Sequence, residues 1–86
     1  MKTKLNFDYE VDYWEVKIYK WDDDAHDCYL FESLEAKDYK EAYLLMRAHS
    51  RKAEYITLTA IPKDTSTPHR EFWEYGKFVR ELSGKR

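Results

Sequence analysis

The segment 13–21 alternates along its length in the way that a half-buried β-strand does. Because successive side chains of a strand point to opposite faces of a sheet, Trp14, Val16 and Ile18 share one face and are predicted to be core residues. The other face carries rings and charges together: Tyr13, Glu15, Lys17, Tyr19 and Trp21. A fold of this chain must therefore bury the first set, and either cover the second or present it to a partner.

Two further strands are predicted. The polar run 22–27 is rich in Asp, which favours turns, so it predicts a hairpin loop into a strand from about Cys28 to Glu35. A third strand is predicted for residues 55–61, which are β-branched and alternating, and Pro62 ends it because proline has no ladder N–H. In the second strand both alternating sets are apolar, so the inward set stays open between Cys28, Leu30 and Leu34 on one side and Tyr29 and Phe31 on the other.

A helix is predicted from Asp38 to about His49. Asp38 is suited to be its N-cap, and Glu41 stands three residues later, as in a capping box. One side of this helix collects the apolar residues at helical spacing: Tyr39, Ala42, Tyr43, Met46 and His49, with Leu45 beside them.

A second helix is predicted from about Pro68 to Leu82. Thr67 would be its N-cap, and proline is favoured at the first helical position. Gly76 would lie in the middle of this helix at a cost of ~1 kcal/mol relative to alanine, which indicates a close approach to another backbone. The apolar stripe would consist of Phe72, Tyr75, Val79 and Leu82.

Together these elements predict one small α+β domain over residues 1–86 with the order ββαβα, in which a helix packs on one face of a mostly antiparallel sheet. Residues 1–12 are predicted to be an extended arm or an extra edge strand, because the alternation of 4–11 changes phase near residue 13, and residues 83–86 are predicted to fray. The predicted core consists of Trp14, Val16, Ile18, Tyr43, Met46, Ile56, Leu58 and Val79.

The sequence predicts a non-enzyme with neither cofactor nor metal. Two glycines in the whole chain are too few for a P-loop or a dinucleotide fingerprint. The Asp22–Asp27 run lacks the central glycine and the spacing of a calcium loop. Cys28 is expected to be a buried, inert thiol, His49 a boundary residue of the first helix, and His69 a surface residue in the first turn of the second.

The outer sheet face is the main candidate site. Either the second helix or the segment 4–11 covers its rings, or the face binds a partner, since Tyr and Trp are over-represented at binding hot spots. Charge supports an acidic binding patch beside it, because residues 1–35 hold ten acids and four bases. Complementarity between the acidic hairpin and basic helices within the chain is the alternative. The predicted partner-binding residues are Tyr13, Tyr19, Trp21, Asp22, Asp23, Asp24, Asp27 and Tyr55.

Nucleic acid is the alternative ligand. Stacking of bases on the sheet is disfavoured because the neighbouring hairpin is acidic. A route through basic residues on the two predicted helices stays open, using Arg47, Arg51, Lys52 and Arg70.

An aromatic hairpin, a helix opening with Asp38-Tyr39-Lys40-Glu41-Ala42 and one more strand make up residues 13–61. This layout resembles that of small accessory proteins of bacteriophages and mobile elements, and that of the antitoxins of some toxin–antitoxin pairs, although the glycine-rich strands of that antitoxin family are missing. The resemblance implies a small protein that inhibits a host or defence protein by occupying its surface, or else an antitoxin-like regulatory domain.

Localisation and assembly are predicted from the same features. The chain has no stretch of ~18 apolar residues and no signal-peptide pattern, so a cytoplasmic protein without membrane contact is expected, in the host cytoplasm if it is viral. Edge strands and exposed rings also predict a homodimer as one form of association.

Overall fold

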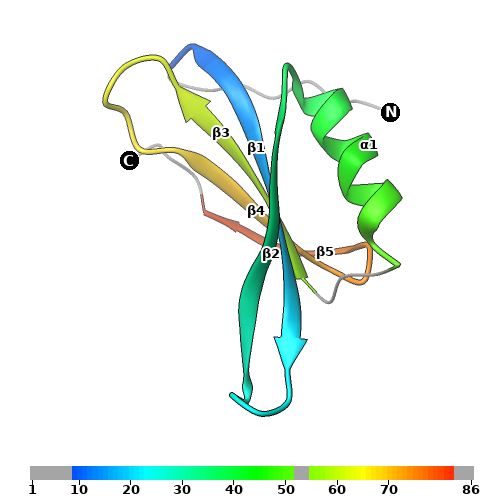
Figure 1. Cartoon of the computed structure of the whole chain (residues 1–86). Coiled ribbons are helices and arrows are strands. Elements are labelled where there is room, and N and C mark those ends of the chain that lie inside the picture. The colour runs from blue at the N-terminus through cyan, green and yellow to red at the C-terminus, as the bar shows by residue number, and fades with distance from the viewer. Residues whose placement is uncertain (1–8, 52–54, 83–86) are drawn as a thin grey trace.

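The computed structural model describes residues 9–51 and 55–82, which form a five-stranded antiparallel sheet with one helix on one face (Figure 1). The strands lie in the order β2-β1-β3-β4-β5, and the small α+β domain predicted from the sequence is confirmed at this level. Residues 1–8 of the arm predicted for 1–12, and the predicted frayed end 83–86, lie outside the described residues. Val11 and Asp12 of that predicted arm are the first residues of β1. The elements are β1 Val11–Asp22, β2 Asp27–Ala36, α1 Tyr39–His49, β3 Tyr55–Pro62, β4 His69–Glu74 and β5 Lys77–Leu82.

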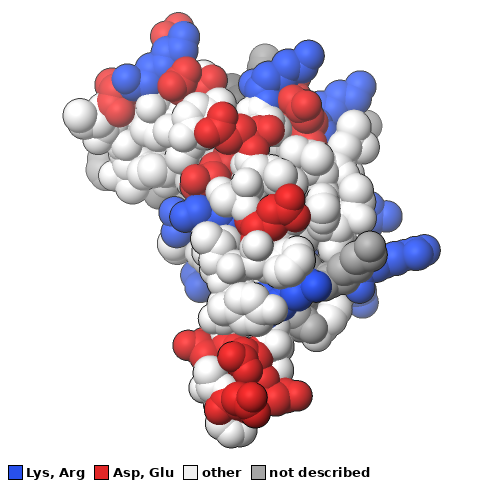
Figure 2. All heavy atoms as spheres, in the orientation of Figure 1, with Lys and Arg blue, Asp and Glu red and all other residues white. Residues whose placement is uncertain are grey.

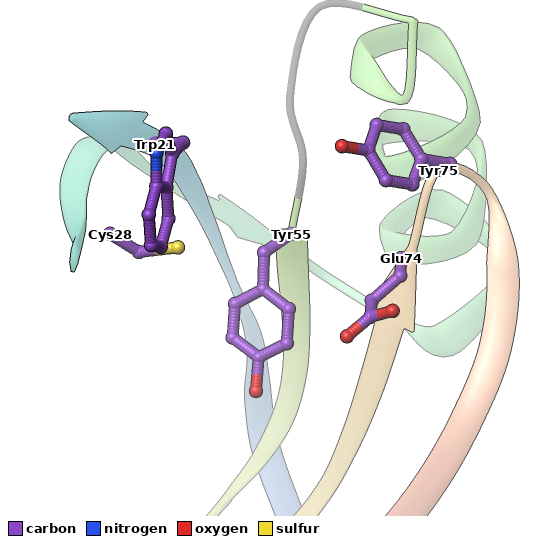
Figure 3. A pocket seen from close by; sticks show the side chains of 5 residues that line it. All are labelled: Trp21, Cys28, Tyr55, Glu74 and Tyr75. Carbon is purple, nitrogen blue, oxygen red and sulfur yellow. The ribbon is translucent and has the colours of Figure 1, made fainter. Parts of the chain in front are cut away.

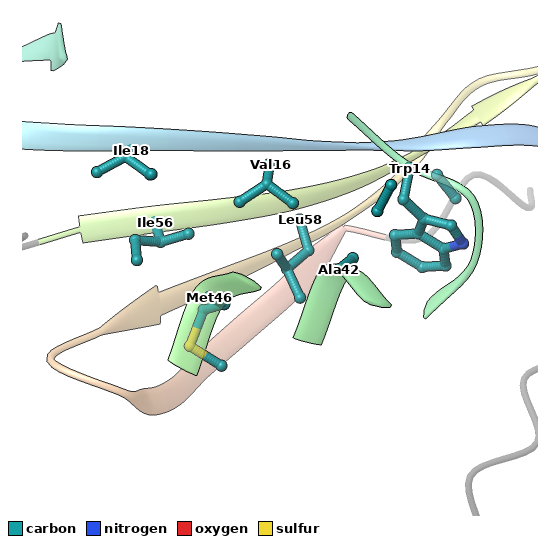
Figure 4. Packing of buried hydrophobic residues seen from close by; sticks show 9 residues of the cluster. Trp14, Val16, Ile18, Ala42, Met46, Ile56 and Leu58 are labelled. Carbon is teal, nitrogen blue, oxygen red and sulfur yellow. The ribbon is translucent and has the colours of Figure 1, made fainter. Parts of the chain in front are cut away.

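The core lies between α1 and the two central strands, β1 and β3. Val16 pairs with Leu58 and Ile18 with Ile56, so the inward side chains of the two strands stand directly opposite each other. They pack against Ala42 and Met46 of α1 (Figure 4). The predicted phases of both strands are therefore confirmed, although Tyr43 of the predicted core is only half-buried.

The acidic side chains of Asp38 and Glu41 determine where α1 begins. Oδ1 of Asp38 accepts a hydrogen bond from the Glu41 backbone N–H at 2.9 Å, and Oε1 of Glu41 accepts one from the Lys37 N–H at 2.8 Å. These two bonds satisfy N–H groups at a helix start that have no partner inside the helix. The predicted N-cap is thus confirmed, and it fixes where α1 begins to cross the sheet.

The predicted second helix is wrong: residues 68–82 form the β4–β5 hairpin. Tyr75 and Gly76 have φ values of 51° and 80°, the two positive values that a type I′ turn requires, and they connect the paired Glu74 and Lys77. A helix cannot pass through two left-handed residues. Val79, a predicted core residue, is 47% exposed on the edge strand, and His69 is buried on β4 instead of lying at a helix surface.

β2 contains a β-bulge, and different sets of its side chains face the core before and after this bulge. Ile18 pairs with Glu32 but Tyr19 pairs with Leu30, which leaves Phe31 as an extra residue. Before the bulge Cys28 and Leu30 lie on the face away from α1, and after it Leu34 packs against the core. Both alternating sets are apolar because the strand changes phase at residue 31.

Candidate functional site

The distal half of the β1–β2 hairpin projects beyond the rest of the sheet (Figure 1). We call residues 19–31 the hairpin arm. The β1–β3 ladder ends at the pair Tyr19–Tyr55, so in the described part of the chain the remainder of the arm is a two-stranded ribbon with no third strand beside it. Four large apolar side chains on the arm are about half exposed: Trp21 (48%), Tyr29 (47%), Leu30 (48%) and Phe31 (52%).

An open hollow of about 460 Å³ lies at the base of the arm, on the sheet face away from α1. Trp21 and Cys28 border it on one side, Tyr55 stands in the middle, and Glu74 and Tyr75 of the β4–β5 hairpin border it on the other (Figure 3). We call it the outer hollow. Cys28, predicted to be buried, is only half-buried and lines this hollow.

Aromatic rings continue from the outer hollow across the sheet. The ring centroids of Tyr19 and Tyr55 are 5.6 Å apart, and those of Tyr55 and Phe72 are 6.1 Å apart. The guanidinium of Arg80 lies 4.2 Å from the Phe72 ring centroid, a cation–π contact. Partial burial raises the pKa of Tyr55 above its ordinary value, so its hydroxyl stays a neutral hydrogen-bonding group.

No second helix covers this outer face in the described part of the chain, because residues 68–82 extend the sheet instead. The face is covered in part by its own side chains. Thr57 and Thr59 are buried among longer neighbours, and Nε of Arg70 donates a hydrogen bond to Oγ1 of Thr59 at 3.0 Å. As far as residues 9–51 and 55–82 are concerned, the rings around the outer hollow are therefore left accessible to a ligand.

A smaller hollow of about 310 Å³ lies on the opposite side of the arm, between β2 and the end of α1. Ile18, Glu32 and His49 line it together with Lys20 and Phe31. Nζ of Lys20 lies 4.0 Å from the Phe31 ring centroid, which holds this ring beside the hollow. His49 is half-buried here, as predicted for a boundary residue. The arm thus has a hollow on each of its two faces.

The tip of the arm is acidic, and Figure 2 shows carboxylates gathered on this projection. Oδ1 of Asp22 accepts a hydrogen bond from the Asp24 N–H at 3.0 Å, and Oδ1 of Asp27 accepts one from the Cys28 N–H at 2.7 Å. Among the described residues no lysine or arginine forms an ion pair with a carboxylate of the tip. Its negative charge is therefore available to a partner.

The structure brings together most of the predicted partner-binding residues. Trp21 and Tyr55 line the outer hollow, the Tyr19 ring lies beside that of Tyr55, and the four aspartates follow at the tip. Tyr13 does not join them: it pairs with Ile61 at the other end of β1, roughly 20 Å from Tyr19 at the rise of a strand.

The alternative basic set does not form one surface. Arg47 and Arg51 are exposed at the end of α1, whereas Arg70 lies on β4, on the sheet face away from the helix. Lys52 lies outside the described residues. The expected grouping of these residues depended on a helix at residues 68–82, where the structure has the β4–β5 hairpin.

Several residues of the surface were not predicted as site residues. Tyr29, Leu30 and Phe31 belong to a strand in which both alternating sets of side chains are apolar. Because both sets cannot face one core, this pattern indicated that some apolar side chains would be exposed. Glu74 and Tyr75 reach the outer hollow only because the β4–β5 turn stands beside β3, which the predicted helix did not allow.

A separate polar cluster lies on the helix side of β4 and β5. His69, Glu71 and Glu81 each offer one ligand atom, and these three atoms lie within 4.8 Å of one another. The Tyr39 hydroxyl donates a hydrogen bond to Oε1 of Glu71 at 3.1 Å. Burial, together with the nearby Glu71 carboxylate, holds the pKa of Tyr39 well above its ordinary value. The expected helix would have put residues 69, 71 and 81 on different sides, so this cluster was not foreseen.

Comparison with protein-family models, with curated proteins and with solved structures gives no match for this chain. Within the described ranges, no helix combines the length and the apolar character that crossing a bilayer requires.

Proposed function

We propose that this protein is a non-enzymatic binding module that binds a partner protein through its hairpin arm. The observation that carries the proposal is the half-exposed state of four large apolar side chains on the two faces of one projecting ribbon. Trp21 and Leu30 lie on one face of the ribbon and Tyr29 and Phe31 on the other, and large apolar side chains that gather at the surface in this way are typical of interaction sites. The same area includes Trp and Tyr, the residue types most often found at hot spots.

The shape of the arm supports a protein as the ligand. Each face offers an apolar hollow that a side chain of a partner can fill, one lined by Trp21 and Tyr55 and the other by Phe31. β2 is also an edge strand, whose outer N–H and C=O groups can pair with an extended segment of another chain. Backbone pairing and two flanking hollows together favour an extended peptide segment over a small molecule.

Charge supports a basic partner surface. The tip presents carboxylates beside Trp21, and acidic side chains around a hydrophobic contact steer a basic partner and exclude an acidic one. A host or defence protein stays our prediction for the partner. Nucleic-acid association through basic residues is not favoured by any observation, because Arg70 and Arg47 lie on opposite faces of the sheet.

Affinity capture with matched variants tests this function. We expect the wild-type chain to retain a protein partner from host lysate, and the double variant Trp21→Ala, Phe31→Ala to lose it. Leu44→Ala is the control, because Leu44 is another large exposed apolar residue but lies on α1, away from the arm. Equal capture by the double variant, or recovery of nucleic acid alone, would contradict the proposal.

A further inference from the structure

Three metal-ligating side chains meet on the helix-facing side of β4 and β5. His69 and Glu71 are two positions apart on β4 and so share a face, and Glu81 is the cross-strand partner of Glu71 on β5. His69 is only 6% exposed and Glu71 only 4% exposed, whereas Glu81 is 54% exposed by its side chain. The group therefore has a buried end and an open end.

The two carboxylates of this group face each other, and a bound cation would compensate their negative charge. Like charges directly opposite each other on neighbouring strands are destabilising, and a buried carboxylate is costly unless its charge is compensated. Among the described residues, neither Glu71 nor Glu81 forms an ion pair with a lysine or arginine. Within that part of the chain the His69 imidazole is the basic group that lies beside both carboxylates.

The spacing of the donor atoms suits a small divalent ion. Nε2 of His69 lies 3.4 Å from Oε2 of Glu71 and 3.9 Å from Oε1 of Glu81. Two ligands of a tetrahedral Zn²⁺ ion stand about 3.3 Å apart, given the usual bond lengths of 2.0–2.2 Å. Small shifts of the exposed Glu81 side chain are enough to close the remaining difference. One imidazole nitrogen and two carboxylate oxygens are donors that Zn²⁺ accepts.

The surroundings hold the two buried donors in place. Oε1 of Glu71 accepts hydrogen bonds from the Tyr39 hydroxyl and from Nε1 of Trp73, both at 3.1 Å, which turns Oε2 toward His69. The Trp14 ring packs edge-on against the imidazole, with centroids 6.3 Å apart. Outer groups that orient the ligands in this way are a regular part of metal sites.

We infer that His69, Glu71 and Glu81 bind one divalent transition-metal ion of the Zn²⁺ type. The ion neutralises the facing carboxylates and joins the edge strand β5 to β4. Three protein ligands leave one tetrahedral position open on the exposed side of Glu81, for water or for a side chain of a partner. This inference does not depend on the function proposed for the hairpin arm, which lies on other elements.

Calorimetric titration of the full chain with Zn²⁺, after treatment with a chelator, tests the inference. We expect one Zn²⁺ per chain, weaker binding of Mg²⁺, which prefers six oxygen ligands, and a rise in melting temperature with Zn²⁺. Glu81→Gln should lower the Zn²⁺ affinity at least tenfold and remove the thermal shift. Because Glu81 is half exposed, this variant is expected to fold. Glu74→Gln is the control, since Glu74 is an exposed acid of β4 that borders the outer hollow instead.

Nitrogen NMR of the imidazole gives a second readout, in which Zn²⁺ should shift Nε2 of His69 in the wild type but not in Glu81→Gln. Equal Zn²⁺ affinity in the wild type and Glu81→Gln would overturn the inference, because binding would then lie elsewhere. Absence of binding heat, with both nitrogens of His69 protonated at neutral pH, would also overturn it. In that case the imidazolium itself compensates the two carboxylates.

Discussion

Gly76 lies against Ser50: a Cβ atom added to this glycine would stand 3.3 Å from Oγ of Ser50. The β4–β5 turn therefore packs against the C-terminal end of α1, where the Ser50 hydroxyl also donates a hydrogen bond to the Arg47 carbonyl at 3.0 Å. This contact ties the second hairpin to the helix, and it makes the turn a sensitive place to test the fold.

Gly76→Ala should lower the free energy of unfolding by about 1–2 kcal/mol, because the residue has φ of 80° and alanine is strained there. In a helix the same change would raise stability by about 1 kcal/mol, so the two folds predict opposite signs. Chemical denaturation measures the difference. Gly76→Asn, which tolerates a left-handed conformation better, should cost less than Gly76→Ala. A stabilised Gly76→Ala would contradict the hairpin.

Ile56→Ala should cost about 2–5 kcal/mol, because Ile56 is buried between Ile18 and the helix and its loss leaves a cavity. Val79→Ala is the matched comparison: it also truncates an aliphatic side chain of a strand, but one on the exposed edge, so its effect should stay within about 0.5 kcal/mol. Urea or guanidinium denaturation of both variants measures this. Similar costs for the two would mean that β5 is covered in solution.

Replacing Asp22, Asp23 and Asp24 together by Asn should slow association with the captured partner and weaken the dependence of its rate on salt. The reason is that steering by exposed charges is screened over about 8 Å at physiological ionic strength. Stability should hardly change, because these carboxylates form no ion pair among the described residues.

Trp21→Ala should instead raise the dissociation rate, because it removes contact area that is buried in the complex. Surface plasmon resonance at several salt concentrations separates the two rates. Glu35→Gln, at the far end of β2, should alter neither rate. Unchanged association in the triple variant would exclude the acidic tip from the contact.

Stability should fall as the pH rises above about 10, with Tyr39 as one cause. Burial raises the pKa of Tyr39 above its ordinary value of 10.0, so the folded state keeps the proton at a pH where the unfolded chain loses it. The contribution of this residue is therefore complete below pH 10 and declines above it, by up to about 1.4 kcal/mol per pH unit.

Tyr39→Phe should make this alkaline decline shallower, because one titrating group is removed. At pH 8 the variant should lose about 1 kcal/mol, since the hydrogen bond to Glu71 disappears. Denaturation curves between pH 8 and pH 11 measure both effects. A decline as steep in the variant as in the wild type would exclude Tyr39 as a contributor.

The sequence predicted β1, α1 and β3 because the patterns of these three elements have one physical reading. Ile18 and Ile56 alternate with polar neighbours, and Asp38 is followed by Glu41 at capping distance. Residues 68–82 were misread because Phe72, Tyr75, Val79 and Leu82 happen to follow helical spacing. In the structure Phe72 lies among the rings of the outer face and Val79 lies exposed on the edge strand.

The candidate site was predictable in part. Trp21 and Tyr55 were placed on one sheet face by alternation alone, and both line the outer hollow. The His69–Glu71–Glu81 cluster was not foreseen, because a burial pattern read from hydrophobicity assigns charged residues to the surface, and Glu71 is buried. The phase change at Phe31 was also hidden, because a bulge is a property of strand pairing.

Among the described strands β5 pairs with β4 alone, while β1 and β3 are each paired on both sides and covered by α1. The backbone of β5 can therefore separate from the sheet without disturbing the core between β1, β3 and α1. We therefore expect amide hydrogen exchange to be slow in the centre of the sheet and faster in β5, which should open locally at a lower free energy than global unfolding requires.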